Sequence, residues 1–162
     1  MILGDQPTLA LIRGPACSGK STFVQEIILV EHPNAVICST DSFFIQHGSY
    51  VFDKHRLKDY HRLNLERCKD AMDAGAPLII IDNTNILPWE MCPYVCASIE
   101  KSYALKLISL PALDLKTLLN RNLERKNTGK FIPPEIIKHH EETYDETIQV
   151  DELKQWCLSN QD

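Results

Sequence analysis

The segment from Gly14 to Ser21 contains the residues of this sequence whose types and spacing most clearly suggest chemistry. It runs GPACSGKS and fits the pattern G-x-x-x-x-G-K-[ST]. The two glycines permit backbone angles that a side chain would forbid, so successive N–H groups can point at one anion. Lys20 can then reach the outer phosphates of a nucleotide, and the Ser21 hydroxyl can bind Mg²⁺. The segment therefore predicts a site for the phosphates of a nucleoside triphosphate and for Mg²⁺.

The surroundings of this segment meet the structural requirement of the motif. An apolar run at residues 8–13 predicts a buried strand before it, and residues 21–31 have a helical pattern after it. The start of that helix adds the positive end of its dipole to the phosphate site. The predicted nucleotide-binding residues are Gly14, Pro15, Ala16, Cys17, Ser18, Gly19, Lys20, Ser21 and Thr22.

An aspartate follows the second apolar run, residues 35–39. Asp41 is expected at the carboxyl edge of a sheet, where ligands of open α/β sheets bind. No arginine lies beside it to hold an acceptor phosphate, whereas an alcohol gains from a carboxylate that takes its proton. Asp41 thus favours a hydroxyl acceptor, and the rings of Phe43 and Phe44 could stack on a base or sugar. The alternative is that Asp41 caps its own turn.

A second aspartate ends the third apolar run, residues 77–81. An apolar strand closing on a carboxylate is typical of the residue that holds the water shell of Mg²⁺, so Asp82 is expected beside Ser21. The three residues that follow, Asn83–Asn85, are short and polar. They either contact the substrate or bind their own backbone.

A basic segment follows the fourth apolar run, residues 104–110. Arg121 and Arg125 are four residues apart and share one face of a predicted helix. A mobile lid at this place could neutralise charge on the phosphoryl group in transfer, with Arg125 the first candidate and Arg121 the second. The alternative is an ordinary solvated charged surface.

Bulk composition limits the possible functions. The chain has 162 residues, a net charge of −5 and a pI of about 5.7, which argues against a general coat for nucleic acids but leaves room for a local basic cleft. No apolar run approaches membrane-spanning length, and the start shows no signal peptide. The six cysteines contain no C-x-x-C pair, and Cys92 and Cys96 are interpreted as buried apolar residues. Reduced thiols favour the cytoplasm, with the nucleus as the alternative.

Several strings of this sequence together resemble the P-loop polynucleotide kinase family. They are GPACSGKST, STDSFF, GSYVFD, IIIDNTN, WEMCPY and NRNLERKNTGKFIPPEII. The likeness runs from Leu9 to Tyr144 and is greatest to the kinase-like domain of ubiquitin-ligase-binding proteins that also carry a small nuclease domain. It implies a 5'-hydroxyl kinase that uses ATP and Mg²⁺, in which Asp41 is the general base and Arg125 contacts the β and γ phosphates. The phage polynucleotide kinase of this family has an arginine three residues after its base, which contacts the 3' phosphate of the acceptor. This sequence has Phe44 at that position, so it departs from the family at the contact to the 3' phosphate.

Strand and helix patterns alternate along the chain, which predicts an α/β fold with a parallel sheet covered by helices on both faces. The expected strand order is 2-3-1-4, with at most one short extra strand. Residues 1–150 are predicted to form a P-loop kinase domain. Residues 151–162 are expected to be a polar, poorly ordered tail.

The sequence thus predicts a kinase that transfers the γ-phosphoryl group of ATP to a hydroxyl, with a 5'-hydroxyl of DNA or RNA as first acceptor. A groove lined by Lys54, Arg56, Lys58 and Arg62 would favour that acceptor. One alternative is a small-molecule hydroxyl of a nucleoside, metabolite or antibiotic. Another alternative is an interaction module that binds ATP but has no acceptor. A side chain of Asp41 that points into its own turn would favour this alternative. The oligomeric state and the choice of DNA or RNA stay open.

Overall fold

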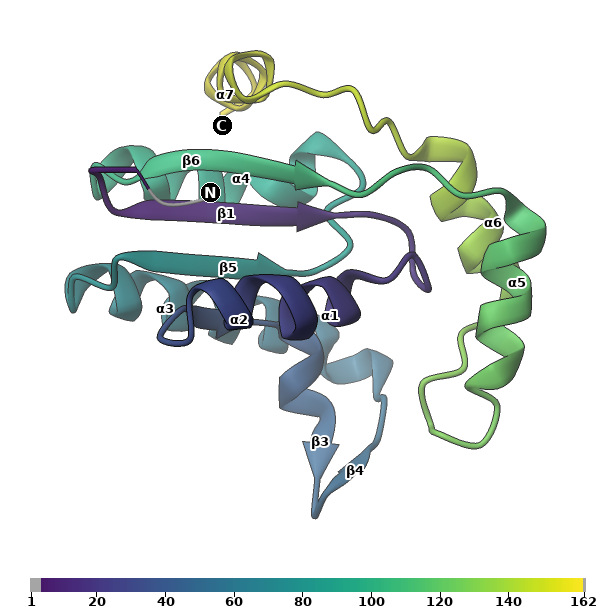
Figure 1. Ribbon diagram of the computed structural model, residues 1–162. Helices are drawn as coiled ribbons and strands as arrows, with labels where there is room; N and C mark the ends of the chain where they lie inside the picture. Colours follow the sequence, from purple (N-terminus) through teal and green to yellow (C-terminus); the bar gives the residue numbers. More distant parts are fainter. Residues whose placement is uncertain (1–3, 162) are drawn as a thin grey trace.

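A computed structural model describes residues 4–161 of the chain (Figure 1). The outermost residues of the predicted domain and tail, 1–3 and 162, lie outside the described part. The main sheet has four parallel strands, in the spatial order β2-β5-β1-β6: β2 (Val36–Cys38), β5 (Leu78–Asp82), β1 (Thr8–Arg13) and β6 (Ala104–Ser109). Numbered along the chain, this is the predicted order 2-3-1-4, which is confirmed.

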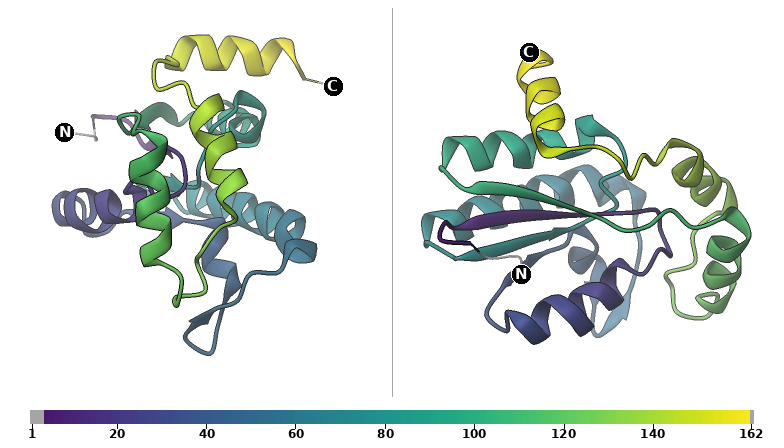
Figure 2. Two further views of the ribbon diagram at one scale, coloured as in Figure 1. Left: turned by 90° about the vertical axis from the view of Figure 1, so that its right-hand side faces the viewer. Right: turned by 45° about the horizontal axis from the view of Figure 1, so that its top comes forward.

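Helices cover both faces of this sheet, which explains why its strands are almost continuously apolar. Leu9 and Leu11 of β1 face α3 (Leu57–Asp73), α4 (Pro88–Glu100) and α7 (Val150–Ser159). Ala10 and Ile12 face the opposite way, because successive side chains of a strand alternate. They pack against a continuous helical segment made of α1 (Lys20–Phe23), the π-helix η1 (Val24–Ile28) and α2 (Leu29–Glu31). Figure 2 shows these two layers on either side of the strands.

The segment after β2 is more ordered than the expected loop. It forms a 3₁₀-helix η2 (Thr40–Phe44) and then a hairpin of β3 (Ile45–Gln46) and β4 (Ser49–Tyr50), followed by a 3₁₀-turn η3 (Lys54–Arg56). The two turn residues, His47 and Gly48, both have positive φ, which matches the twist of a tight hairpin. The hairpin projects away from the main sheet (Figure 1).

Two helices after β6 stand beside the carboxyl edge of the sheet, at the right of Figure 1. They are α5 (Leu115–Glu124) and α6 (Pro134–Thr143). The Asp114 side chain accepts the N–H of Thr117 at 2.7 Å and caps α5. Leu118 and Ile137 form a small core with Ala16 and Cys17, so both helices rest directly on the loop after β1. We call residues 115–143 the lid.

The expected disordered tail is helix α7 instead. Its polar sequence hides an apolar pair one turn apart, Leu153 and Cys157, which are buried against α4. Cys157 forms a disulfide with Cys92, which corrects the prediction that Cys92 is a reduced thiol. No helix within residues 4–161 is long and apolar enough to cross a membrane.

Candidate active site

The loop between β1 and α1 has the shape of an anion cradle. Gly19 has a φ of 98°, and Cys17, at 71°, also adopts the left-handed region. Gly14 has no room for a side chain, because an added Cβ would lie 2.5 Å from Oγ of Ser18. The N–H of Phe23 makes the first helical hydrogen bond, to the carbonyl of Gly19, so the amides just before it are available to a ligand. Buried Oγ of Ser18 has no partner within residues 4–161.

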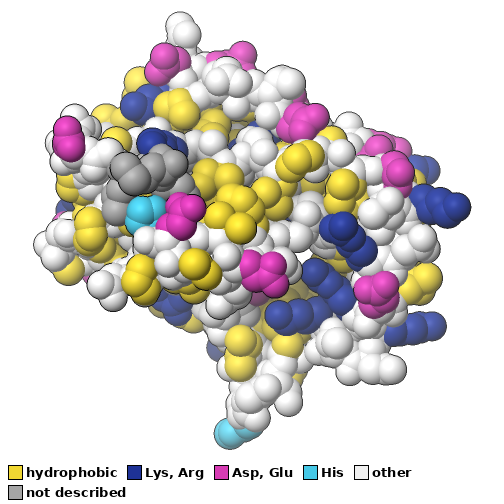
Figure 3. Space-filling view, in the orientation of Figure 1, with side chains coloured by type: hydrophobic (Ala, Val, Ile, Leu, Met, Phe, Trp, Pro, Cys, Tyr) yellow, Lys and Arg dark blue, Asp and Glu magenta, His cyan; other side chains and the backbone are white. Residues whose placement is uncertain are grey.

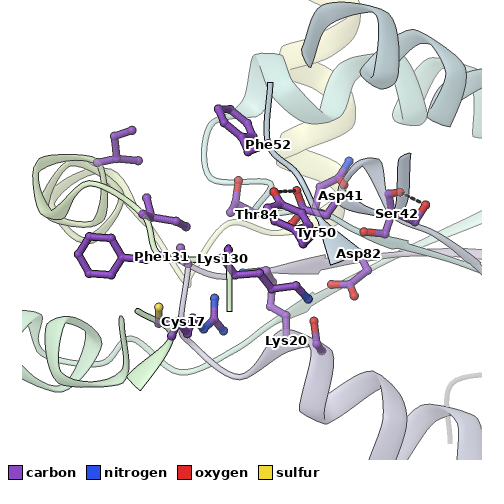
Figure 4. A pocket seen from close by; sticks show the side chains of 18 of the residues that line it. Cys17, Lys20, Asp41, Ser42, Tyr50, Phe52, Asp82, Thr84, Lys130 and Phe131 are labelled. Carbon is purple, nitrogen blue, oxygen red and sulfur yellow. Dashed lines mark hydrogen bonds between the residues drawn. The ribbon is translucent and has the colours of Figure 1, made fainter. Parts of the chain in front are cut away.

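Lys20 points into a cavity of about 470 Å³ that the loop shares with the hairpin and the lid (Figure 4). Its ammonium donates to the carbonyl oxygens of Gly14 at 2.8 Å and Pro15 at 2.9 Å. Burial lowers the pKa of Lys20 to about 8, against the opposing effect of the Asp82 carboxylate. An anion that replaced the two carbonyls would therefore hold the lysine more firmly in its charged form.

Ser21 and Asp82 line this same cavity and could hold a metal ion. Burial raises the pKa of Asp82, and the Lys20 ammonium partly offsets that effect. The Asp82 carboxylate makes no hydrogen bond to any described residue, so its oxygens are free to accept from water around a cation. A hydroxyl and one carboxylate, completed by phosphate and water oxygens, are the donor set that Mg²⁺ prefers.

Asp41 lies in η2 but does not cap its own turn. The turn is closed by Ser42, whose N–H and hydroxyl both donate to the carbonyl of Ser39. The Asp41 carboxylate instead accepts the hydroxyl of Tyr50 at 3.2 Å, and Figure 4 shows this pair at the edge of the cavity. Burial raises the pKa of Tyr50, and the nearby Asp41 carboxylate adds to the shift. Tyr50 therefore stays a neutral donor.

The lid places one of its two predicted arginines in the cavity. Arg125 lines it, and its guanidinium makes no hydrogen bond or ion pair within the described chain. Arg121 does not line it and instead donates to the carbonyl of Cys17 at 3.1 Å, so it supports the loop. At the lid tip, Gly129 sits so close to Tyr50 that an added Cβ would lie 2.7 Å from the Tyr50 carbonyl oxygen.

A second cavity, of about 840 Å³, adjoins the first. Asp41, Leu57, Asn83, Thr84 and His140 line both cavities. Lys54, Lys58 and Arg62 line only the second, together with His61 and Trp89. Arg56, expected with them, lies outside the lining. On a protein that is acidic overall, Figure 3 shows further Lys and Arg side chains gathered in the hollow between the hairpin and the lid, which is the side of the first cavity.

Two of the polar residues after β5 turn out to serve the backbone. The side-chain amide of Asn85 is buried and donates to the carbonyl of Ile12 at 2.7 Å. Oδ1 of Asn83 accepts the N–H of Thr40 at 3.0 Å, which ties η2 to the end of β5. Thr84 keeps its side chain in both cavities while its carbonyl accepts the N–H of Gly14.

The two aromatic residues beside Asp41 do not face the site, which corrects their expected stacking role. Phe44 is 1% exposed and packs edge-on against Tyr60, with ring centroids 4.7 Å apart. Phe43 lies 4.2 Å beneath the guanidinium of Arg67 and lines neither cavity. Burial of Phe44 fastens η2 to α3, so its role is to hold Asp41 in place.

His140 and Tyr50 are site residues that the sequence did not single out. His140 reaches the loop from α6, and its Nδ1 accepts the N–H of Ala16 at 3.3 Å. Burial lowers the pKa of His140 to about 4, with Lys20 adding to the shift, so the ring is neutral near pH 7 and able to accept. Spacing could have drawn attention to His140, which follows the apolar Ile136 by four residues on α6. No pattern in the sequence around Tyr50 marks it as a site residue.

Comparisons with known proteins agree with this geometry. A family model described as an AAA domain matches residues 9–148. Human NEDD4-binding protein 2 is 43% identical over 95 residues, which are 59% of this chain and 5% of that protein. A chain of the Pnkp1/Rnl/Hen1 RNA repair complex superposes with a TM-score of 0.68 at 23% identity, covering 98% of this chain and 47% of that one.

A third similar structure is that of AvrRxo1-ORF1:-ORF2 with ATP, with a TM-score of 0.61 at 21% identity. It covers 85% of this chain and 47% of that one. This chain thus spans less than half the length of each of these three relatives. The family match and the fold confirm the resemblance that the motifs indicated: the chain belongs to the AAA domain family and fits its P-loop, polynucleotide-kinase-like members.

Proposed function

We propose that this chain transfers the γ-phosphoryl group of ATP to the 5'-hydroxyl of a polynucleotide. The observation that carries this proposal is the position of Asp41, which lies on the wall shared by the two cavities. One cavity has the phosphate loop, Lys20 and Arg125, and the other has a basic lining. A general base has to lie between the phosphoryl donor and the acceptor, and a carboxylate on the wall between the two cavities meets that requirement.

In this proposal the first cavity holds the triphosphate. The loop amides and Lys20 bind the β and γ phosphates, and Arg125 neutralises charge that develops on the transferring group. Ser21 and Asp82 are the residues that would hold Mg²⁺. When bound, the metal ion draws negative charge from the phosphate oxygens. The similar fold that was solved with ATP supports the choice of nucleotide.

Asp41 accepts the proton of the attacking hydroxyl as the oxygen–phosphorus bond forms and the bond to the β-phosphate oxygen breaks. The products are ADP and a phosphorylated acceptor, with the proton on the Asp41 carboxyl group. Because phosphoryl transfer depends mostly on position and charge, a rigid seat for this carboxylate is important. The Tyr50 hydroxyl and the packing of Phe44 supply that seat.

The basic lining of the second cavity favours a polynucleotide over a small neutral alcohol. Three of the four residues that were expected to mark such an acceptor, Lys54, Lys58 and Arg62, line it. A strand with repeated phosphates gains from each of these cations, whereas a nucleoside or sugar gains little. Asp41 is also turned away from its own turn, which counts against an interaction module without an acceptor.

Radiolabelled ATP and a panel of acceptors test the proposal directly. We expect label on 5'-hydroxyl DNA or RNA strands, none on the same strands with a 5' phosphate, and little on nucleosides. The Asp41→Asn variant is the control for a contaminating kinase. Transfer to nucleosides or sugars alone would refute the polynucleotide acceptor, and ATP binding without transfer to any acceptor would refute the kinase.

We also propose the cytoplasm or nucleus as the compartment, because both supply ATP. The Cys92–Cys157 disulfide removes part of the argument from reduced thiols. The need for ATP is therefore the stronger reason for proposing these compartments.

A further inference from the structure

Trp89 is the feature of the second cavity that the proposed reaction leaves unexplained. Its side chain is 64% exposed, although indole is among the side chains that gain most from burial. It lines the second cavity together with Lys58 and Arg62, and that cavity reaches Asp41. An exposed indole beside cations is the usual composition of a surface that binds single-stranded nucleic acid.

The start of α4 holds Trp89 in a fixed place. Pro88 opens the helix, and Glu90 caps it, because its Oε2 accepts the N–H groups of Ile86 at 2.7 Å and Leu87 at 2.9 Å. Trp89 therefore sits on a backbone that is ordered on both sides. Only the side-chain torsions of Trp89 then remain to be fixed when a planar ligand stacks on its ring, so the loss of entropy is small.

The charges around Trp89 fit a strand that passes the indole. Lys54 and Lys58 form no ion pair with any described residue, and Lys58 and Arg62 are one helical turn apart on α3. The carboxylates in the lining are Asp41 and Glu90, and Glu90 is engaged by the two amides of its helix start. Lys54 and Lys58 are thus free to contact phosphates, whereas Arg62 is paired with Glu66 at 2.9 Å.

We propose that Trp89 stacks on a nucleobase within the first two nucleotides of a single-stranded acceptor, while Lys58 and Lys54 contact its backbone phosphates. This inference rests on the proposed function, because that function places the 5' end at Asp41. It replaces Phe43 and Phe44, the stacking residues expected from sequence, with a ring from a different element. Stacking of this kind is tolerant of base identity, so the enzyme accepts all four bases.

A kinetic experiment combines Trp89→Ala with an abasic acceptor. The acceptors are 5'-hydroxyl oligonucleotides of ten nucleotides, intact or with the first two bases removed, and a control lacks two bases at its 3' end. We expect loss of the terminal bases to raise the KM of the wild-type protein by about ten- to a hundredfold. In Trp89→Ala we expect the KM for the intact acceptor to be raised by the same factor already. Removal of the two bases should then not raise the KM of this variant any further. Trp89→Phe keeps a ring and recovers most of the affinity.

Equal effects of base removal in the wild type and in Trp89→Ala would overturn the stacking. Trp156→Phe is the matched control, because Trp156 is also exposed but lies on α7 and lines neither cavity. Thermal unfolding of each variant shows whether it is folded before its KM is compared.

A binding experiment separates this inference from the proposed function. In Trp156→Phe the indole emission comes from Trp89 alone. We expect the intact oligonucleotide to quench it and the strand without its first two bases to leave it unchanged. Absence of quenching by the intact strand overturns the stacking whether or not the protein is a kinase. Quenching without phosphorylation of any 5'-hydroxyl strand supports the stacking and refutes the kinase.

Discussion

The hydroxyl of Tyr50 lies 3.2 Å from Oδ1 of Asp41 and donates a hydrogen bond to it. Tyr50 comes from β4 of the hairpin and Asp41 from η2, so the bond connects two separate elements at the proposed point of transfer. Lys130 of the lid lies 5.6 Å from the centre of the Tyr50 ring. One tyrosine thus touches the proposed base on one side and the lid on the other.

Tyr50→Phe is expected to lower kcat by about tenfold, the effect of one hydrogen bond to a charged group, with little change in the KM for ATP. The reason is that the carboxylate loses the donor that orients it. Steady-state kinetics at saturating acceptor measure the change. Tyr60→Phe is the control, because Tyr60 packs on the same Phe44 ring without a hydrogen bond to Asp41. A tenfold rise in the KM for ATP with unchanged kcat would contradict a positioning role.

Asp41→Asn is expected to reduce transfer by about a hundredfold or more, because an amide cannot take the proton of the acceptor hydroxyl. ATP affinity should stay nearly intact, since the phosphates are held by the loop and Lys20. Isothermal calorimetry gives the affinity, and a single-turnover assay gives the rate. Asp59→Asn on the exposed side of α3 serves as control. Wild-type transfer by Asp41→Asn rules out the base assignment.

Arg125→Ala and Arg121→Ala should have different effects, although the two arginines are only one helical turn apart. Arg125 faces the cavity, so its loss should lower kcat by about a thousandfold with a small change in ATP affinity. Arg121 donates to the loop carbonyl of Cys17, so its loss should lower stability and affinity by about 1 kcal/mol while kcat changes little. If Arg125→Ala lost only affinity, its role in the reaction would be wrong.

ATP affinity is expected to fall above pH 8. Burial lowers the pKa of Lys20 to about 8, so the free protein loses this proton near pH 8, whereas bound phosphates keep the lysine charged. Binding then takes up a proton, and the affinity falls by up to about tenfold per pH unit above that value and is constant below it. Titrations between pH 7 and 10 measure this. Lys20→Arg, always charged, should show no fall, and identical profiles for both proteins would contradict the assignment.

The disulfide between Cys92 and Cys157 should stabilise the fold by holding α7 on α4. It joins residues separated by 65 positions, so Cys157→Ser is expected to lower the free energy of unfolding by about 2–4 kcal/mol without reductant. Wild-type protein with reductant should match the variant in urea unfolding. Cys96→Ser, which removes a free thiol of the same helix, is the control. A variant as stable as the oxidised wild type would show that packing alone holds α7.

Sequence alone predicted the features that depend on local pattern. The phosphate loop, the order of the four strands and the placement of Asp82 follow from one motif and from the rules of alternating strands and helices. Features that depend on distant packing were missed. Trp89 and Asp41 are 48 positions apart in the chain and line one cavity only because the fold brings the start of α4 and η2 to two sides of it.

The errors have a similar physical origin. Phe44 was expected to face a ligand because it neighbours Asp41, but η2 turns its ring toward Tyr60 and out of the cavity. Helix α7 was missed because most of its residues are polar, and only two side chains mark its buried face. The pairing of Cys92 with Cys157 could not be predicted from the spacing of the cysteines, because it depends on where α7 lies in the fold.

Gly129 at the lid tip has a consequence for the order of events in each catalytic cycle. Its backbone rests against the Tyr50 carbonyl, in a left-handed conformation that leaves no space for a side chain. Both residues also line the cavity of the phosphate loop, so this contact joins the lid to the hairpin at the wall of that cavity. For the proposed kinase we expect separation of Gly129 from Tyr50 to slow the departure of ADP, so that the first turnover after mixing is the fastest.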